Sequence, residues 1–223
     1  MIKTPDLIAS LAANATPVRR LRPPVTRAAC WLLLAAIVLA LLAVNQGIRP
    51  DLVERLRDAT FVAGLIASLL TGALAAVAAF LLSLPDRSRL WFLLPLPALF
   101  VWLSNIGYQC LVQWMAIGPD GVSAGEAFRC FATLVLTSLP LSLAMLVMLR
   151  YAAPLRPTTV ILMGSLAVAA ITATALSLFH ASDATVMILI WNVGTALLFV
   201  GLGGAFGRRM FRWVAPRMFY SQE

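Results

Sequence analysis

Long apolar runs alternate along the chain with short polar segments rich in charged residues, Pro and Gly. A helix needs roughly 20 apolar residues to cross a hydrocarbon core of about 30 Å, and six runs without any charged residue are long enough. They cover residues 28–48, 60–84, 90–112, 131–149, 158–179 and 185–207. Because the backbone polar groups of such spans must be satisfied internally, the pattern predicts an all-α membrane protein, built as a bundle of six transmembrane helices.

The composition supports this fold class. Of the 223 residues, 61% are hydrophobic and only 12% are charged, and the mean hydropathy is +0.93. Soluble domains carry about 25% charged residues. The polar and basic residues 1–27 precede the first apolar run, whereas a signal peptide places its short apolar region near the N-terminus. We therefore expect the first run to be an uncleaved membrane anchor.

The distribution of Lys and Arg predicts the orientation of the chain. Six spans place both termini on one side of the membrane, and this side holds thirteen of the 17 Lys and Arg residues. The positive-inside rule therefore predicts that both termini are cytoplasmic. The expected organisation is a cytosolic N-terminal segment (1–27), the transmembrane domain (28–207) and a basic cytosolic tail (208–223).

The N-terminal segment is predicted to contain a short amphipathic helix. Thr4 is suited to cap this helix and Pro5 to occupy its first position, while Leu7, Ile8 and Leu11 fall on one stripe. A helix of about ten residues is marginal in water unless its apolar stripe packs against something. Lipid and a cytosolic protein partner are both suitable surfaces.

Four parts of the chain carry a family resemblance: "TPDLIASLAANATPVRRLRPP", "LPDRSRLWFLLPLPAL", "APLRP" and the late "FH…D…WN" stretch. Together with the six spans, they resemble the NrsF family of membrane-bound anti-sigma factors. The resemblance implies a protein of the bacterial inner membrane that binds an extracytoplasmic-function sigma factor and releases it on a stress signal.

The most specific part of the resemblance is the basic motif that precedes the first span. It implies that Arg19, Arg20, Leu21 and Arg22, together with the N-terminal helix, contact the sigma factor. An apolar stripe beside cations suits a partner with an acidic contact face. The alternative interpretation is that these arginines only set the topology and contact anionic membrane lipids.

The three cysteines differ in their predicted surroundings. Cys30 lies at the inner end of the first span, where we expect a small, buried apolar residue. Cys110 and Cys130 are predicted near the outer surface, which is oxidising in a bacterium, and they flank a loop of 19 residues. Their pairing as a disulfide is sterically feasible, and the alternative is that both thiols simply pack at the membrane interface.

The NrsF resemblance implies that cysteines on the outer face sense oxidants or heavy metals. Cys130 matches the first of these positions, but the second, after the fifth span, is replaced by Phe179, His180 and Ala181. Three alternatives follow: Cys110 replaces the missing cysteine, Cys130 and His180 bind a metal together, or Cys130 acts alone. A lone histidine at a helix end is also typical of a hydrogen-bonded interfacial residue.

Small and polar residues within the spans predict close helix packing. Three small residues recur at every fourth position of the second span, namely Gly64, Ser68 and Gly72. This spacing suits packing inside the bundle or between the protomers of a homo-oligomer. Pro95 and Pro97 are expected to kink or loosen the third span and Pro140 the fourth. Asn105 is a candidate for an interhelical hydrogen bond.

The sequence also argues against several functions. The six spans lack the charged residues that coupled transport uses. No catalytic motif with its partner residues is present, so we expect neither an enzyme nor a bound cofactor. The net charge of +8 follows the predicted topology and does not indicate direct nucleic-acid binding. The alternative function is a small-solute channel or a lipid-interacting membrane scaffold.

Overall fold

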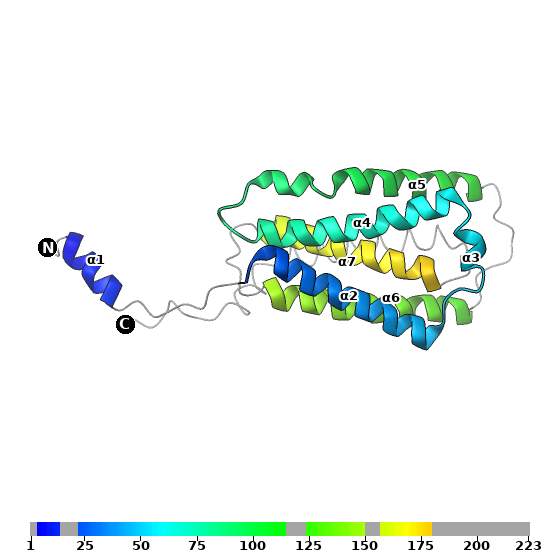
Figure 1. Cartoon of the computed structure of the whole chain (residues 1–223), viewed down its shortest axis with the longest axis horizontal. Coiled ribbons are helices and arrows are strands. Elements are labelled where there is room, and N and C mark those ends of the chain that lie inside the picture. The colour runs from blue at the N-terminus through cyan, green and yellow to red at the C-terminus, as the bar shows by residue number, and fades with distance from the viewer. Residues whose placement is uncertain (1–3, 14–21, 115–123, 150–156, 180–223) are drawn as a thin grey trace.

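The computed structural model describes residues 4–13, 22–114, 124–149 and 157–179. All regular structure in these four segments is helical (Figure 1). In chain order the helices are α1 (Thr4–Ala13), α2 (Pro24–Gln46), α3 (Leu52–Arg55), α4 (Ala59–Leu82), the 3-10 helix η1 (Arg89–Leu93), α5 (Leu96–Trp114), α6 (Ala124–Leu149) and α7 (Pro157–Phe179). The prediction of an all-α protein is confirmed for this part of the chain.

Five helical segments within the described residues are long and apolar enough to cross a membrane. They are Pro24–Gln46, Ala59–Leu82, Arg89–Tyr108, Phe131–Leu149 and Thr158–Phe179. Their positions agree with the first five spans expected from the hydrophobic pattern. The sixth expected span, residues 185–207, lies outside the described residues, so the count of six stays a prediction.

Local sequence signals set the boundaries of the helices. α2 begins directly after Pro23 and has Pro24 at its first position, where the missing amide hydrogen is not needed. It ends at Gly47, whose φ of 75° is unfavourable for residues with a Cβ atom. α4 is capped by the Asp58 carboxylate, which accepts a hydrogen bond of 2.9 Å from the Thr60 amide.

The prolines in the third and fourth spans have different effects. The third span is divided, since η1 ends at Leu93 and α5 begins at Leu96, on either side of Pro95. Proline lacks the amide hydrogen that a continuous helix would use at that position. α6 instead continues through Pro140 to its last residue, Leu149. The predicted weak point is therefore confirmed in the third span, whereas the fourth is one helix.

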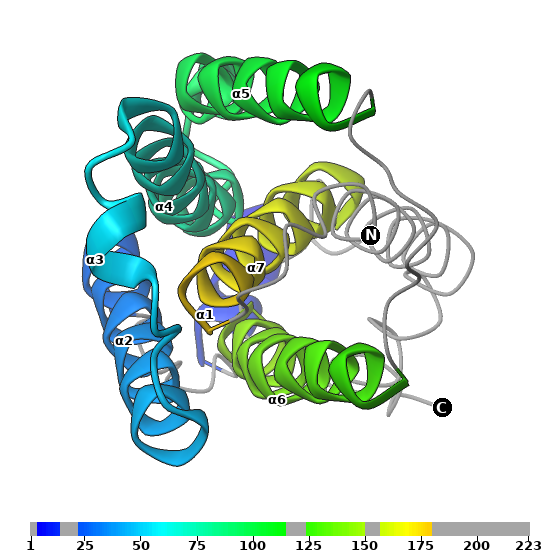
Figure 2. The same ribbon diagram turned by 90° about the vertical axis from the view of Figure 1, so that its right-hand side faces the viewer.

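α4 and α7 form the centre of the described bundle. α4 packs against α7, α5 and α2, and α7 also packs against α6 (Figure 1). Figure 2 shows α5 and α6 at opposite sides of this arrangement. Small residues bring the two central helices close together. The fully buried alanines include Ala75, Ala76, Ala78 and Ala79 of α4 and Ala167, Ala170 and Ala175 of α7.

The small residues of α4 meet α7 closely, as the spacing predicts. A Cβ atom added to Gly72 would lie 2.9 Å from two side-chain carbons of Ile171. One turn earlier, the hydroxyls of Ser68 and Thr174 share a buried hydrogen bond of 2.9 Å. The repeat of small residues thus serves packing inside the described bundle.

Asn105 joins α5 to α4, which confirms the predicted interhelical hydrogen bond. Its side-chain amide donates to the Thr60 carbonyl at 2.9 Å. A Cβ atom on Gly64 would lie only 2.7 Å from Oδ1 of Asn105. The glycine therefore makes room for the polar side chain of the neighbouring helix.

Cys30 is exposed on α2, so the prediction that it is buried is wrong. Consecutive residues of an α-helix are turned by about 100° about its axis. Burying the indole of Trp31, which has no exposed surface, therefore directs Cys30 away from the core. The hydrophobic pattern alone did not distinguish these two neighbouring positions.

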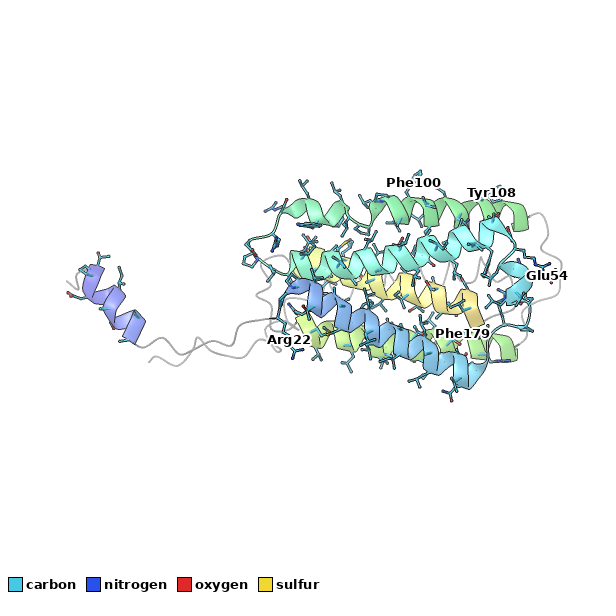
Figure 3. All side chains as sticks on the ribbon, in the orientation of Figure 1. Arg22, Glu54, Phe100, Tyr108 and Phe179 are labelled. Carbon is cyan, nitrogen blue, oxygen red and sulfur yellow. The ribbon has the colours of Figure 1, made fainter. Side chains whose placement is uncertain are left out.

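The bundle has two ends, which we name after residues labelled in Figure 3. The Arg22 end holds the first residues of α2 and α7 and the last residues of α4 and α6. The Glu54 end holds α3, the last residues of α2, α5 and α7, and the first residues of α4 and α6.

Candidate functional site

Of the predicted sigma-factor contacts, Ile8 and Arg22 have described side chains. α1 forms over the predicted residues, and Figure 1 shows it beyond this end of the bundle. Ile8 is 61% exposed, and Arg22 is exposed just before α2. Arg19, Arg20 and Leu21, as well as the side chains of Leu7 and Leu11, lie outside the described residues. Their contact with a partner stays a prediction.

Arg27, in the first turn of α2, is buried rather than facing lipid or water. Only 6% of its surface is exposed. Its Nη2 donates to the carbonyl of Met148 in the last turn of α6, and its guanidinium lies 5.0 Å from the ring centroid of Phe80 in α4. Carbonyls at a helix C-terminus lack intrahelical donors and attract cations. Arg27 therefore ties the beginning of α2 to the ends of α4 and α6.

Exposed charges at the Arg22 end are mainly positive among the described residues. Arg22, Arg87 and Arg89 are exposed there, and Asp86 is the acidic residue in the same region. Asp86 and Arg87 form an exposed ion pair at 3.8 Å. Such surface pairs contribute little to stability, but the excess of arginine makes this end suitable for an acidic surface.

Arg49 is the corresponding buried arginine at the Glu54 end. Its amide donates to the Leu178 carbonyl at 3.2 Å, and its Nη1 donates to the Ser177 carbonyl at 3.4 Å, both in the last turn of α7. Its Nε and Nη2 donate to the two carboxylate oxygens of Asp51 at 2.8 and 2.7 Å. The guanidinium also lies 5.7 Å from the ring centroid of Phe61 in α4. One side chain thus joins the turn after α2 to α4 and α7.

The Asp51 carboxylate stays ionised over the physiological pH range. The bidentate hydrogen bonds from Arg49 are the main cause, and they lower the pKa of Asp51 to about 2. Arg55 contributes a longer hydrogen bond of 3.5 Å to the same carboxylate. Physiological acidification therefore does not protonate this carboxylate.

Gln46, the last residue of α2, is hydrogen bonded to α6. Its side-chain amide lies 2.7 Å from the Thr133 hydroxyl, which is fully buried and also lies 2.9 Å from the Arg129 carbonyl. The Thr133 hydroxyl faces Oε1 of Gln46, and its one proton is donated either to this oxygen or to the Arg129 carbonyl. Thr133 is one helical turn beyond Cys130. The end of α2 is therefore joined to the turn that carries this cysteine.

The predicted sensing residues come from different helices of the Glu54 end. Cys110 belongs to α5 and Cys130 to α6, and their side chains lie outside the described residues, as does His180, which follows the last residue of α7. α5 packs on α4, whereas α6 packs on α2 and α7, so these two helices are not packed along each other in the described bundle (Figure 2). The roles of the three residues stay predictions, and the described residues hold no cluster of three metal-ligating side chains.

Sequence reasoning missed the two buried arginines and the bond between Gln46 and Thr133. Arg27 and Arg49 stand next to an apolar span, where arginine usually indicates topology. The pair of Arg49 and Asp51, two residues apart, was a usable signal for an ion pair at a span end. Nothing in the local pattern indicated which carbonyls the guanidinium groups would reach.

A comparison with family models shows which proteins the chain resembles. The NrsF model, described as negative regulator of sigma F, matches residues 11–213. The chain belongs to the NrsF family. Its membership makes it a negative regulator of a sigma factor, with that sigma factor as its partner, and places it among regulatory rather than catalytic proteins. Neither the curated proteins nor the solved structures contain a significant match.

The NrsF match includes almost all of the features described above. It begins within α1 and continues through the basic motif, both buried arginines and the whole described bundle. The resemblance found in the sequence is therefore confirmed at the level of the family. The matched residues include Leu11 and the basic motif, whereas Leu7 and Ile8 precede them.

Proposed function

We propose that this NrsF protein holds an extracytoplasmic-function sigma factor at the bacterial inner membrane and releases it when its outer face is modified by an oxidant or a heavy metal. One observation carries the proposal most strongly. The exposed Arg22, at the end of the basic motif, leads within two residues into α2, whose first turn is anchored by the buried Arg27. A binding segment that is joined directly to a firmly held helix suits a membrane tether for a soluble partner.

The proposed orientation puts the Arg22 end and both termini in the cytoplasm. Arg22, Arg87 and Arg89 are exposed at this end, which supports the orientation through the positive-inside rule. Short basic segments of this kind also contact anionic lipids, each residue contributing about 1 kcal/mol near the surface. Lipid contact and sigma-factor binding are compatible roles for different arginines.

The proposed sigma-factor-binding surface combines an apolar stripe with cationic side chains. Leu7, Ile8 and Leu11 of α1 would enter an apolar groove of the sigma factor, and Ile8 is 61% exposed and available for it. Arg19, Arg20 and Arg22, with Leu21 among them, would meet acidic side chains around the groove. Complementary charge of this kind speeds association and selects the partner.

Release would be a two-state change that a signal at Cys130 biases, with Cys110 or His180 as its partner. Moving an equilibrium from 1:99 to 99:1 requires a bias of roughly 5.5 kcal/mol. A disulfide typically contributes about 2–4 kcal/mol. A covalent or metal bond, together with the contacts that it rearranges, would therefore supply a free-energy bias of the required size.

The described interior favours this function over the channel or scaffold alternative. Buried hydroxyls in the spans mostly return to carbonyls of their own helix, as Thr71, Thr137 and Thr172 do at 2.7–2.8 Å. Polar groups that are satisfied in this way do not offer ligands to a passing solute. The interior is filled by alanines and larger apolar side chains instead.

Co-purification with a sigma factor tests the proposal. The full chain is purified in detergent from a host that co-expresses the candidate sigma factor, as wild type, as Arg19→Ala/Arg20→Ala and as Arg57→Ala, an exposed control at the Glu54 end. We expect the sigma factor to stay with the wild type and the control and to be lost from the double variant. A wild-type eluate without any sigma factor would contradict the proposal.

A further inference from the structure

α2 is the helix that connects the two candidate sites. It has 23 residues, and at a rise of 1.5 Å per residue it is about 35 Å long. At the Arg22 end it follows the basic motif, and at the Glu54 end it finishes beside α6, which carries Cys130, and α7, which ends one residue before His180. A displacement of α2 would therefore shift residues at both ends of the bundle.

Polar bonds hold α2 to the antiparallel α6 at three heights. Arg27 donates to the Met148 carbonyl near one end, and Gln46 bonds to Thr133 at 2.7 Å near the other. Between them, the Trp31 indole N–H donates to the Leu141 carbonyl at 3.1 Å. Hydrogen bonds between helices resist sliding more specifically than apolar contacts do. α2 and α6 are thus joined by polar contacts along their length.

A second set of bonds holds the turn after α2 to α7. Both the amide and the guanidinium of Arg49 donate to α7, at the carbonyls of Leu178 and Ser177. These carbonyls belong to the last turn of α7, just before Phe179 and His180. Arg49 is 6% exposed, so water does not readily replace these contacts.

Both sets of contacts lie next to predicted sensing positions. The Thr133 hydroxyl lies 2.9 Å from the carbonyl oxygen of Arg129, the residue directly before Cys130. Arg49 donates to the Ser177 carbonyl in the last turn of α7, which precedes His180. In this inference, a bond formed at Cys130 acts first on the turn of α6 that leads to Thr133. The contacts with α2 are the first interhelical polar contacts of the described structure that such a change would reach.

We propose that α2 transmits the state of the Glu54 end to the sigma-factor-binding segment. The bonds of Gln46 with Thr133 and of Arg49 with α7 hold α2 in the position in which the basic motif grips its partner. Breaking these bonds weakens sigma-factor binding at the opposite end of the helix. This inference rests on the proposed function, because it assigns the regulation of the same binding segment.

The test measures the affinity of the purified sigma factor for the full chain in detergent. The contact variant, Gln46→Ala/Arg49→Ala/Thr133→Val, removes the side-chain bonds of α2 at the Glu54 end. We expect its affinity to fall at least tenfold, because the gripping state loses the contacts that favour it. Thr133→Val alone, which keeps the shape of the side chain, is expected to lower the affinity about threefold, in line with one modest interhelical bond.

The control variant is Thr174→Val/Arg57→Ala. Thr174 shares an equally buried interhelical hydrogen bond with Ser68, but between α4 and α7 rather than on α2, and Arg57 is exposed at the same end as Arg49. It repeats the Thr→Val and Arg→Ala changes of the contact variant and also removes an interhelical bond, but it leaves α2 and Gln46 unchanged. We expect its affinity to stay within twofold of the wild type.

The outcomes separate the inference from the proposed function. Absence of binding by the wild type would count against the proposed function itself. Binding by the wild type with equal affinity in the contact variant would overturn the inference alone, and so would an equal loss in the control variant. If the triple variant does not fold, the sigma-factor affinities of Thr133→Val and Thr174→Val are compared instead. Equal affinities of these two variants would overturn the inference.

Discussion

Arg27 and Arg49 stand at opposite ends of α2, and each donates to the last turn of a different helix. Arg27 binds the Met148 carbonyl of α6, and Arg49 binds the Ser177 carbonyl of α7. Each guanidinium also lies over a phenylalanine ring of α4, 5.0 and 5.7 Å from the centroid. Arginine suits both positions because it offers several donors in one plane and stacks on aromatic rings. α2 and the turn after it are thereby held to α4, α6 and α7.

Arg27→Ala is expected to destabilise the bundle by about 1–3 kcal/mol, since it removes a charge-assisted hydrogen bond and a ring contact. The loss is partly offset, because Nη1 of Arg27 is buried without a hydrogen-bond partner in the described structure. Arg27→Lys should be intermediate, as lysine can donate but does not stack as a plane. Thermal unfolding of the full chain in detergent measures the effect.

The control for Arg27 is Arg89→Ala, which changes an exposed residue at the same end. Exposed substitutions usually change stability by less than about 0.5 kcal/mol. Equal unfolding temperatures for Arg27→Ala and Arg89→Ala would show that the buried arginine does not hold the helices together.

Gly72→Ala should destabilise the contact between α4 and α7. The new Cβ atom would lie 2.9 Å from two carbons of Ile171 and 3.3 Å from the Ala167 carbonyl oxygen. Overpacking of this kind typically costs about 1–3 kcal/mol. Gly107→Ala has nothing within 4 Å of the new atom, so the higher helix propensity of alanine should leave it neutral or more stable.

A double-mutant cycle with Ile171→Ala checks the cause of the Gly72 effect. If the clash is responsible, the penalty of Gly72→Ala becomes smaller once the Ile171 carbons are removed. An unchanged penalty, measured by unfolding in detergent, would place the strain elsewhere.

The ion pair of Arg49 and Asp51 should contribute to stability down to low pH. The pKa of Asp51 is lowered from 3.8 to about 2 by the hydrogen bonds from Arg49. A carboxyl whose pKa is depressed on folding stabilises the fold above its unfolded pKa, and this contribution is lost as the pH falls through the folded value. We therefore expect Asp51→Asn to be less stable than the wild type at pH 6, with the difference disappearing between about pH 4 and 2.

Unfolding curves of both proteins over this pH range measure the Asp51 effect. Glu54→Gln, an exposed change in the neighbouring helix, serves as the control. A difference between wild type and Asp51→Asn that is as large at pH 2 as at pH 6 would contradict the assigned pKa.

Mild substitutions of the neighbours Cys30 and Trp31 should change the stability of the bundle to different extents. Cys30→Ala changes an exposed side chain and should alter stability by less than about 0.5 kcal/mol. Trp31→Phe keeps the ring in the core but removes the bond to the Leu141 carbonyl, and should cost about 1 kcal/mol. Unfolding in detergent distinguishes them, and a larger loss for Cys30→Ala would reverse the assigned faces of α2.

Much of the fold follows from local features of the sequence. Uncharged runs of about 20 residues leave only a helix as a way to satisfy the backbone in a membrane, and all five runs within the described residues are helical. The boundaries at Pro24 and Pro95 depend on the missing amide hydrogen of proline. The family also follows from the sequence, since the basic motif lies within the matched residues 11–213.

The surroundings of individual side chains were decided only by the tertiary structure. The sequence shows that Arg27, Arg49 and Cys30 lie near span ends, but their burial depends on which helices pack beside α2 and at what rotation. A buried guanidinium needs acceptors for its hydrogen bonds, and those of Arg27 and Arg49 include the carbonyls of Met148 and Ser177. Such pairings join residues more than a hundred positions apart, so they cannot be predicted from the local order of apolar and polar residues.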